Sequence, residues 1–260
     1  MPPSINLSTS SVFPNTELGF RLAAEHGFDG VEVMVNHDRN SQTVESVQAL
    51  AETYGVPIRS VHVPCLVVSQ HVWGFNPEVK LRRSVEMATA VGADVVVVHP
   101  PFRWQREFAG TFAALVDELH QSEDGPVVTV ENMYTVEALG RIVRPYLADA
   151  DEDFAGYQAI TLDTSHAGAD RRDVLELYDL WRGRVSHLHL SDSTTNRGDE
   201  HLPPGMGTLP LAELAGAMVA DNFSGHVVLE VGIGRLPEPT RDAVTADCAA
   251  FAREAFGASR

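Results

Sequence analysis

The 260-residue chain has only two cysteines, a single lysine and no long apolar run. Cys65 and Cys248 are too few for a disulfide framework and form no CxxC zinc motif. No stretch approaches the ~20 apolar residues that span a bilayer. The N-terminal residues lack the basic region and apolar run of a signal peptide. We therefore expect a cytoplasmic protein without a membrane segment.

Several functional signatures are also absent. The sequence has no GxGxxG or GxxxxGK[ST] phosphate-binding loop and no GxSxG motif of a nucleophilic serine. Its 36 acidic and 19 basic residues give a formal net charge of -17. This charge opposes non-specific attraction to nucleic-acid phosphates or anionic lipid.

Eight short apolar runs, rich in β-branched residues, alternate with segments of helical periodicity. The predicted strands are Ile5–Ser8, Gly30–Val35, Ile58–Val63, Asp94–Val98, Val127–Val130, Ala159–Leu162, Val185–Leu190 and His226–Val231. The predicted helices are Thr16–His26, Thr43–Tyr54, Pro77–Val91, Glu107–His120, Thr135–Leu147, Arg172–Trp181, Pro210–Val219 and Thr240–Phe256. Within the third helix, Pro77 suits the first turn and Gly92 suits the C-cap.

This alternation predicts parallel strands joined by helical crossovers. A doubly wound open sheet is the competing topology, but the phosphate loops typical of that class are missing. No linker rich in proline, glycine or serine divides the chain. We predict one α/β domain over residues 1–260, a (β/α)8 TIM barrel.

Functional residues of such barrels gather at the carboxyl ends of the strands. Here those ends, and the loops that follow them, carry acids and histidines: Glu32, His62, His99, Glu131, Asp163, His166, His189, Asp199, His201 and Glu230. Taken singly, each is readily explained as a hydrogen-bonded core residue, a helix cap or an ion-pair partner. Seven successive strands that end in such residues instead indicate a shared metal site. Oxygen and nitrogen donors without thiolate suit Zn, Mn, Co or Fe(II).

His187 lies two residues before His189 and should face the same way, one layer deeper. We assign it to the core or to support of the site. Trp73, Phe75, Phe102 and Trp104 lie in the loops after the third and fourth strands, where their rings could bind substrate or pack together.

The acids and histidines at the strand ends lie in segments that resemble the xylose isomerase-like barrel superfamily, which includes sugar-phosphate isomerases, epimerases and endonuclease IV. The matching segments are GFDGVEV (Gly27–Val33), SVHVP (Ser60–Pro64), VVVHP (Val96–Pro100), VENM (Val130–Met133), LDTSHAG (Leu162–Gly168), HLHLSD (His187–Asp192), GDEHLPPGMGTL (Gly198–Leu209) and VVLEV (Val227–Val231). They occur in the order of the family and cover nearly the whole chain.

The isomerase and epimerase branch implies one divalent metal, held by Glu131, Asp163, His189 and Glu230. In that branch the two glutamates also move a proton at the carbon beside a sugar carbonyl. A metal that stabilises the enediolate, with a carboxylate on each face of the carbon, makes this chemistry reasonable. The same resemblance implies substrate contacts for His166 and Arg197, and we add Glu32 and Trp104 as candidates.

Endonuclease IV implies a wider set, a three-zinc cluster that cleaves phosphodiesters. Its nine ligand positions match His62, His99, Glu131, Asp163, His166, His189, Asp199, His201 and Glu230. The resemblance therefore allows one to three divalent ions, with Zn, Mn or Co as the candidates.

Three observations favour small-molecule chemistry over a nuclease. Cys65 replaces a tyrosine that endonuclease IV inserts into DNA, and Glu32 in GFDGVEV is more typical of the isomerase branch. The strong negative charge, with Lys80 as the single lysine, gives no sign of a phosphate-binding surface. We expect a metal-dependent isomerase or epimerase of a sugar, sugar phosphate or polyol ketone. An endonuclease IV-like phosphodiesterase and a dehydratase or lyase remain alternatives, and a homo-oligomer is left open.

Overall fold

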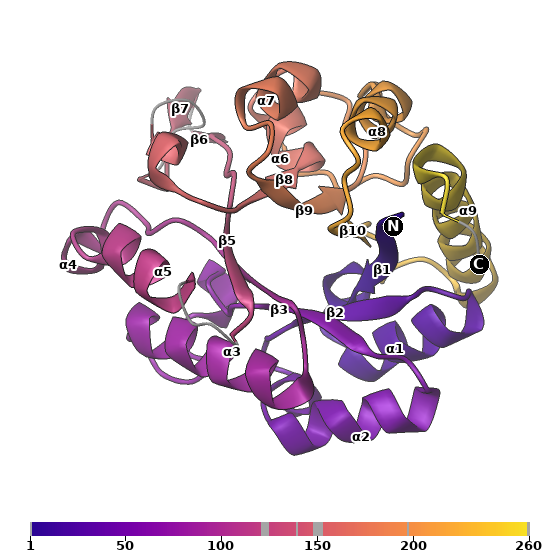
Figure 1. Ribbon diagram of the computed structural model, residues 1–260, viewed down its shortest axis with the longest axis horizontal. Helices are drawn as coiled ribbons and strands as arrows, with labels where there is room; N and C mark the ends of the chain where they lie inside the picture. The colour runs from indigo at the N-terminus through magenta and orange to yellow at the C-terminus, as the bar shows by residue number, and fades with distance from the viewer. Residues whose placement is uncertain (1, 121–124, 139, 148–152, 197, 259–260) are drawn as a thin grey trace.

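The computed structural model describes residues 2–120, 125–138, 140–147, 153–196 and 198–258. Eight parallel strands close into a barrel in the order β1-β10-β9-β8-β5-β4-β3-β2. Figure 1 labels most of these strands and shows the helices around them. These strands are β1 (Ser4–Ser8), β2 (Gly30–Met34), β3 (Ile58–His62), β4 (Val95–Val98), β5 (Val127–Glu131), β8 (Ile160–Asp163), β9 (Val185–Leu190) and β10 (His226–Leu229). The predicted (β/α)8 barrel is confirmed, and every predicted strand is found with its ends within two residues.

The strands are apolar because both of their faces are covered. β4 consists of four valines, all buried, and pairs in parallel register with β3 and β5. Since parallel strands share one direction, their carboxyl ends form one rim of the barrel.

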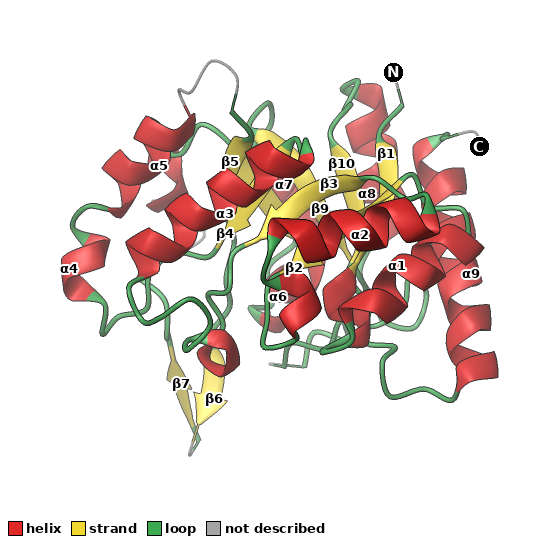
Figure 2. Ribbon diagram, turned by 90° about the horizontal axis from the view of Figure 1, so that it is seen from below, coloured by secondary structure: helices red, strands yellow, loops and turns green. Residues whose placement is uncertain are grey.

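Helices surround the barrel, as Figures 1 and 2 show. They are α1 (Thr16–Glu25), α2 (Val44–Tyr54), α3 (Pro77–Val91), α4 (Arg106–Ala109), α5 (Phe112–His120), α6 (Thr164–Ala169), α7 (Val174–Leu180), α8 (Leu211–Ala220) and α9 (Glu238–Phe256). Short 3-10 helices lie at η1 (Thr9–Val12), η2 (Arg39–Ser41), η3 (Val67–Ser69) and η4 (Asp153–Gly156). As predicted, Pro77 lies in the first turn of α3, and Gly92 caps its end with a φ of 69°. No helix of the described residues combines the length and the apolar character needed to cross a bilayer.

Two helix predictions are wrong. The segment Thr135–Leu147 contains no helix in its described residues but an antiparallel hairpin of β6 (Val136–Ala138) and β7 (Arg141–Val143). Its β-branched side chains favour strands, and Gly140 adopts a φ of 69° that a helix does not allow. Figure 2 shows the hairpin projecting away from the barrel.

The predicted helix Glu107–His120 is divided into α4 and α5 at Gly110. Glycine is a poor helix former, and here its N–H caps the end of α4 by pointing to the carbonyls of Arg106 and Glu107. The chain therefore turns once before it continues as α5.

Candidate metal centre

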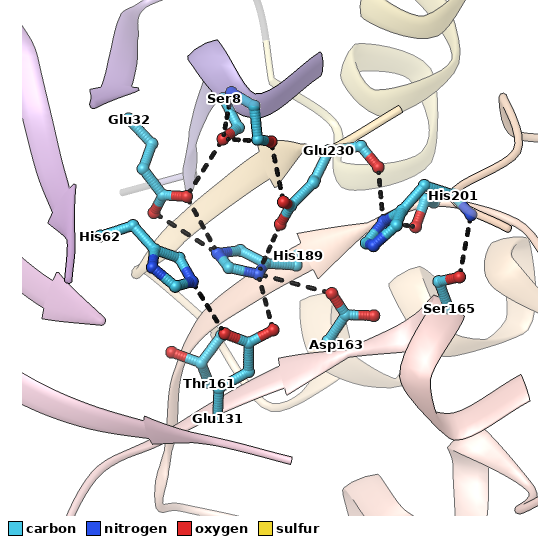
Figure 3. A network of polar contacts seen from close by, with 12 residues as sticks. Ser8, Glu32, His62, Glu131, Thr161, Asp163, Ser165, His189, His201 and Glu230 are labelled. Carbon is cyan, nitrogen blue, oxygen red and sulfur yellow. Dashed lines mark hydrogen bonds and ion pairs between the residues drawn. The ribbon is translucent and has the colours of Figure 1, made fainter. Parts of the chain in front are cut away.

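Four predicted ligands meet at the carboxyl rim. Glu131, Asp163 and His189 lie on β5, β8 and β9, and Glu230 directly follows β10. His189 Nδ1 lies 2.9 Å from Glu230 Oε2, 3.3 Å from Glu131 Oε1 and 3.5 Å from Asp163 Oδ2 (Figure 3). One donor atom from each residue lies within 4.8 Å of the others, and all four residues are buried. We call these four residues the quartet.

The quartet fits a divalent cation. Three carboxylates and one imidazole supply the oxygen and nitrogen donors that Mn, Co and Zn accept. Asp163 Oδ2 is buried and accepts no hydrogen bond from any described residue, which is costly unless a cation or water satisfies it. Burial alone would raise the pKa of Glu131, but the charges of His189 and His99 outweigh it and hold the pKa well below its ordinary value. Without a cation, protonated histidines balance the carboxylates.

Glu131 also contacts three more of the predicted histidines. His62 Nε2 and His99 Nε2 each lie 3.1 Å from Glu131 Oε2, and His166 Nδ1 lies 3.2 Å from Oε1. Burial opposes protonation of His99, but the negative charges of Cys65 and Glu131 raise its pKa to about 9. Glu131 is therefore the central carboxylate of the cluster, with histidines facing both of its oxygens.

A further group joins His166 to the loop after β9. His201 Nε2 lies 2.9 Å from Asp199 Oδ1, and His166 Nε2 lies 3.6 Å from Asp199 Oδ2. Asp163, His166 and His201 also offer donor atoms within 4.8 Å of one another. The structure thus brings all nine predicted ligands into one continuous cluster.

The short helix α6, which the sequence analysis missed, places His166. Asp163 is its N-cap, and its side chain accepts a 2.8 Å hydrogen bond from the backbone N–H of His166. The Asp-x-x-His spacing spans one turn, so both side chains face the same cluster. The signal was present in the sequence as a capping aspartate before Thr164.

Asp192 shapes the loop that carries Asp199 and His201. Its buried carboxylate accepts four backbone N–H bonds of 2.8–3.0 Å, from residues at both ends of the loop: Ser193, Gly205, Gly207 and Leu209. A Cβ on Gly207 would lie 2.3 Å from Asp192 Oδ1, so only glycine fits there. The loop is therefore folded around one buried carboxyl group.

Glu32 lies beneath the quartet and is fully buried. Its carboxylate accepts a 2.8 Å hydrogen bond from Ser60 Oγ and lies 2.9 Å from His187 Nε2 and 3.2 Å from His189 Nε2. Figure 3 shows that His189 is held between Glu32 on one side and the quartet carboxylates on the other. This geometry favours orientation of His189 over direct contact of Glu32 with substrate. His187 lies in the deeper layer, where the sequence placed it.

A cavity of about 200 Å³ reaches the quartet at Glu230. Ser10 Oγ, at its edge, donates a 2.7 Å hydrogen bond to Glu230 Oε1. Polar and apolar side chains from the ends of several strands and the segments that follow line the cavity, among them Ser10, Phe13, Met34, Leu66, Asp199, His201 and Glu230. Sequence reasoning missed Ser10, Phe13, Met34 and Leu66 because they are not metal-ligand types.

The remaining predicted substrate residues lie elsewhere or are not described. Trp104 is 59% exposed and stacks on Phe102, which stacks on Tyr146, whose ring meets His99 edge-on. Trp104 is thus linked to the cluster by aromatic contacts without lying in it. Arg197 lies outside the described residues.

Cys65, which stands where endonuclease IV has a tyrosine, also lies at this cluster. Its Sγ is within 4.8 Å of donor nitrogens of His62 and His99. Burial opposes ionisation of the thiol, but the charges of His99 and His62 prevail and lower the pKa of Cys65 to about 6. The cluster therefore contains a sulfur donor that the sequence analysis did not assign to it.

Comparison with known proteins places this chain among related sequences. The sequence model of the family described as "Xylose isomerase-like TIM barrel" matches residues 20–254. An uncharacterized protein of Mycobacterium leprae is 39% identical over an alignment of 270 positions that covers 96% of each chain. The 3-dehydro-D-guloside 4-epimerase of Escherichia coli is 25% identical, over 87% of this chain and 91% of its own.

Solved structures share the fold. D-allulose 3-epimerase from Methylomonas sp., in complex with D-allulose, superimposes with a TM-score of 0.70 at 15% identity, over 98% of both chains. An AP endonuclease, family 2, from Brucella melitensis also gives a TM-score of 0.70, at 20% identity over 96% of this chain and 99% of that one. At these identities the structures support the fold and not a particular activity.

Proposed function

Because the chain belongs to the xylose isomerase-like TIM barrel family, we propose that it is a divalent-metal-dependent isomerase or epimerase of a sugar, sugar phosphate or polyol ketone. The observation that carries this proposal is the quartet, which offers two glutamates, an aspartate and a histidine where the cavity reaches Glu230. The cavity combines a few polar groups with apolar side chains, as small-molecule sites do.

In this proposal Glu131, Asp163, His189 and Glu230 hold the metal. When bound, the ion supplies electrostatic stabilisation of the negative charge that develops on the carbonyl and hydroxyl oxygens of the substrate. Glu230 faces the cavity, where Ser10 donates a hydrogen bond to it. It removes the proton from the carbon beside the carbonyl. The protonated histidines that face Glu131 supply the proton that Glu131 delivers from the other side.

Other side chains orient the substrate. Asp199 and His201 line the cavity and can hydrogen-bond hydroxyl groups, whereas Phe13 offers an apolar face against which a sugar ring can pack. His166, Trp104 and Arg197 remain proposed substrate-binding residues. The 3-dehydro-D-guloside 4-epimerase of Escherichia coli, which is 25% identical to this chain, supports this substrate class. The proposal includes a cytoplasmic location, in which Cys65 and Cys248 stay reduced as the free thiols observed here.

Deuterium incorporation tests this proposal directly. Protein loaded with Mn or Co is incubated in D2O with a panel of ketoses and their phosphates, and NMR records exchange at the carbon beside the carbonyl. We expect exchange and a new epimer or isomer, with both lost in Glu131→Gln and Glu230→Gln. Glu52→Gln, an exposed control on α2, should behave as the unmodified protein. Retained turnover in both glutamine variants at the quartet would exclude the mechanism.

A phosphodiesterase is the second candidate, because the structure assembles all nine ligand types that endonuclease IV implies. The same protein loaded with zinc is assayed with a small phosphodiester and with an abasic-site duplex. Hydrolysis without any deuterium exchange would replace the isomerase proposal with this one. The net charge of -17 favours the first outcome over cleavage of DNA.

A further inference from the structure

A separate cavity of about 470 Å³ lies between the start of α7 and the loop after β9. The turn before α7 and both arms of the loop form its walls, among them Arg171, Arg172, Asp173, Thr195, Asn196 and Leu209. These walls are distinct from the cavity at Glu230 and include none of the nine predicted ligands. We call this cavity the arginine pocket.

The arginine pocket concentrates positive charge in a strongly acidic chain. Arg171 and Arg172 line it side by side in the sequence, whereas the whole chain carries a net charge of -17. The one acid among the described lining residues, Asp173, is the N-cap of α7 and accepts a 2.8 Å hydrogen bond from the backbone N–H of Leu175. Guanidinium groups match the geometry of phosphate oxygens, so this lining favours a phosphate group over a cation.

Two residues of the arginine pocket have strained backbones. Arg171 and Thr195 adopt φ angles of 58° and 60°. Residues other than glycine rarely adopt this region, and a β-branched threonine there is an outlier. The two residues are also joined, because Arg171 Nε donates a 3.3 Å hydrogen bond to the carbonyl of Thr195. Strain of this kind gathers at ligand-binding sites, where it holds the binding groups in place.

The walls of the arginine pocket belong to the segments that position Asp199 and His201. Both residues lie in the loop that contains Thr195. From α6, Ser165 Oγ donates a 3.1 Å hydrogen bond to Asp199 Oδ1 and accepts a 3.0 Å hydrogen bond from the backbone N–H of His201. Arg171 lies two residues after the end of α6. A ligand that holds Arg171 and Thr195 together therefore fixes α6 against the loop.

We propose that the arginine pocket binds a phosphate group, either as inorganic phosphate or as part of a small phosphorylated metabolite. Arg171 and Arg172 pair with the phosphate oxygens, and Thr195 and Asn196 add a hydroxyl and an amide to the wall. Leu209 offers an apolar surface for the body of a metabolite. The bound phosphate stabilises the loop that carries Asp199 and His201, so the site regulates the metal centre without touching the reacting atoms. The proposal does not depend on isomerase activity.

Isothermal titration calorimetry tests the arginine pocket with three probes: sodium phosphate, glycerol 3-phosphate and uncharged glycerol. Sodium chloride keeps the ionic strength constant. The proteins compared are the unmodified chain, Arg171→Gly, Arg172→Ala and the control Arg235→Ala, whose arginine is exposed and lies outside the pocket. Glycine adopts a φ of 58° without strain, so Arg171→Gly removes the guanidinium and keeps the turn. Circular dichroism verifies that each variant is folded.

We expect both phosphates, but not glycerol, to bind the unmodified protein and Arg235→Ala. Binding should be about 10-fold or more weaker in Arg171→Gly and Arg172→Ala, because each variant removes charged hydrogen bonds. Tighter binding of glycerol 3-phosphate than of phosphate would identify a metabolite as the ligand, and the reverse order would identify the free anion.

Two results would overturn the proposal. One is that neither phosphate binds the unmodified protein. The other is undiminished binding in Arg171→Gly, or in Arg172→Ala if Arg171→Gly does not fold, because the anion would then lie elsewhere, as at a bound metal. Deuterium exchange, measured without phosphate, tests the proposed function separately.

Discussion

The Glu32 carboxylate provides a sharp test of how the quartet is oriented. Glu32→Gln keeps the shape of the side chain and removes its negative charge. In the structure this carboxylate lies 3.2 Å from His189 Nε2, on the side of the ring opposite the quartet. It is the only acceptor that the described residues offer to that nitrogen. A glutamine can still accept one hydrogen bond from His189, but without a negative charge it no longer increases the basicity of the imidazole nitrogen that binds the metal.

The expected effect follows from this contact. Loss of a carboxylate that orients a metal-bound histidine typically weakens metal binding about 10- to 100-fold, or about 1.4–2.7 kcal/mol. Burial of Glu32 opposes its ionisation, yet the charge of His189 holds its pKa well below the ordinary value, so the carboxylate is charged at neutral pH. We therefore expect the full loss at pH 7.

Competition with a chromophoric chelator measures the affinity of metal-free protein for Mn or Zn. Glu52→Gln, exposed on α2, serves as the control for loss of one surface carboxylate. Thermal melts followed by circular dichroism confirm that each variant is folded. Unchanged metal affinity in folded Glu32→Gln would refute the reasoning. If that variant instead raised only KM, Glu32 would contact substrate directly, as the sequence analysis suggested.

Three further predictions concern the pH dependence of metal binding, the loop after β9 and Trp104 in the loop after β4. Burial opposes protonation of His189, but the charges of Glu32 and Glu230 hold its pKa well above the ordinary value. Metal affinity should therefore rise with pH, and binding should release protons, because a protonated imidazole cannot bind metal; titrations that find the affinity independent of pH would contradict this. Asp192→Asn leaves about two of the four backbone N–H groups without an acceptor. It should lower the free energy of unfolding, measured by urea denaturation, by about 2–6 kcal/mol. An unchanged midpoint of the urea transition would show that the loop does not depend on this carboxylate. Trp104→Ala should raise KM about 3- to 10-fold with little change in kcat, as measured by steady-state kinetics. An unaltered KM would show that Trp104 does not belong to the substrate site.

The amino-acid sequence by itself determined the barrel and the rim of ligands. Runs such as Val95–Val98 are apolar on both faces, which is the local mark of a strand in a covered parallel sheet. Once eight such strands are parallel, the end of each strand is also a position on one shared rim. The convergence of Glu131, Asp163 and His189 therefore followed from the order of residues along the chain.

The tertiary structure decided in which layer of the barrel each polar side chain lies and which distant segments contact one another. Whether Glu32 meets substrate or supports His189 depends on its layer in the barrel, which the sequence does not record. The approach of Cys65 to His99 joins two loops through the packing of β3 against β4 and the buried Lys80. The hairpin around Gly140 replaced a predicted helix because β-branched content and a positive φ outweighed helical spacing. Local patterns thus specified the elements and their order, whereas side-chain proximity across the barrel came only from its closed geometry.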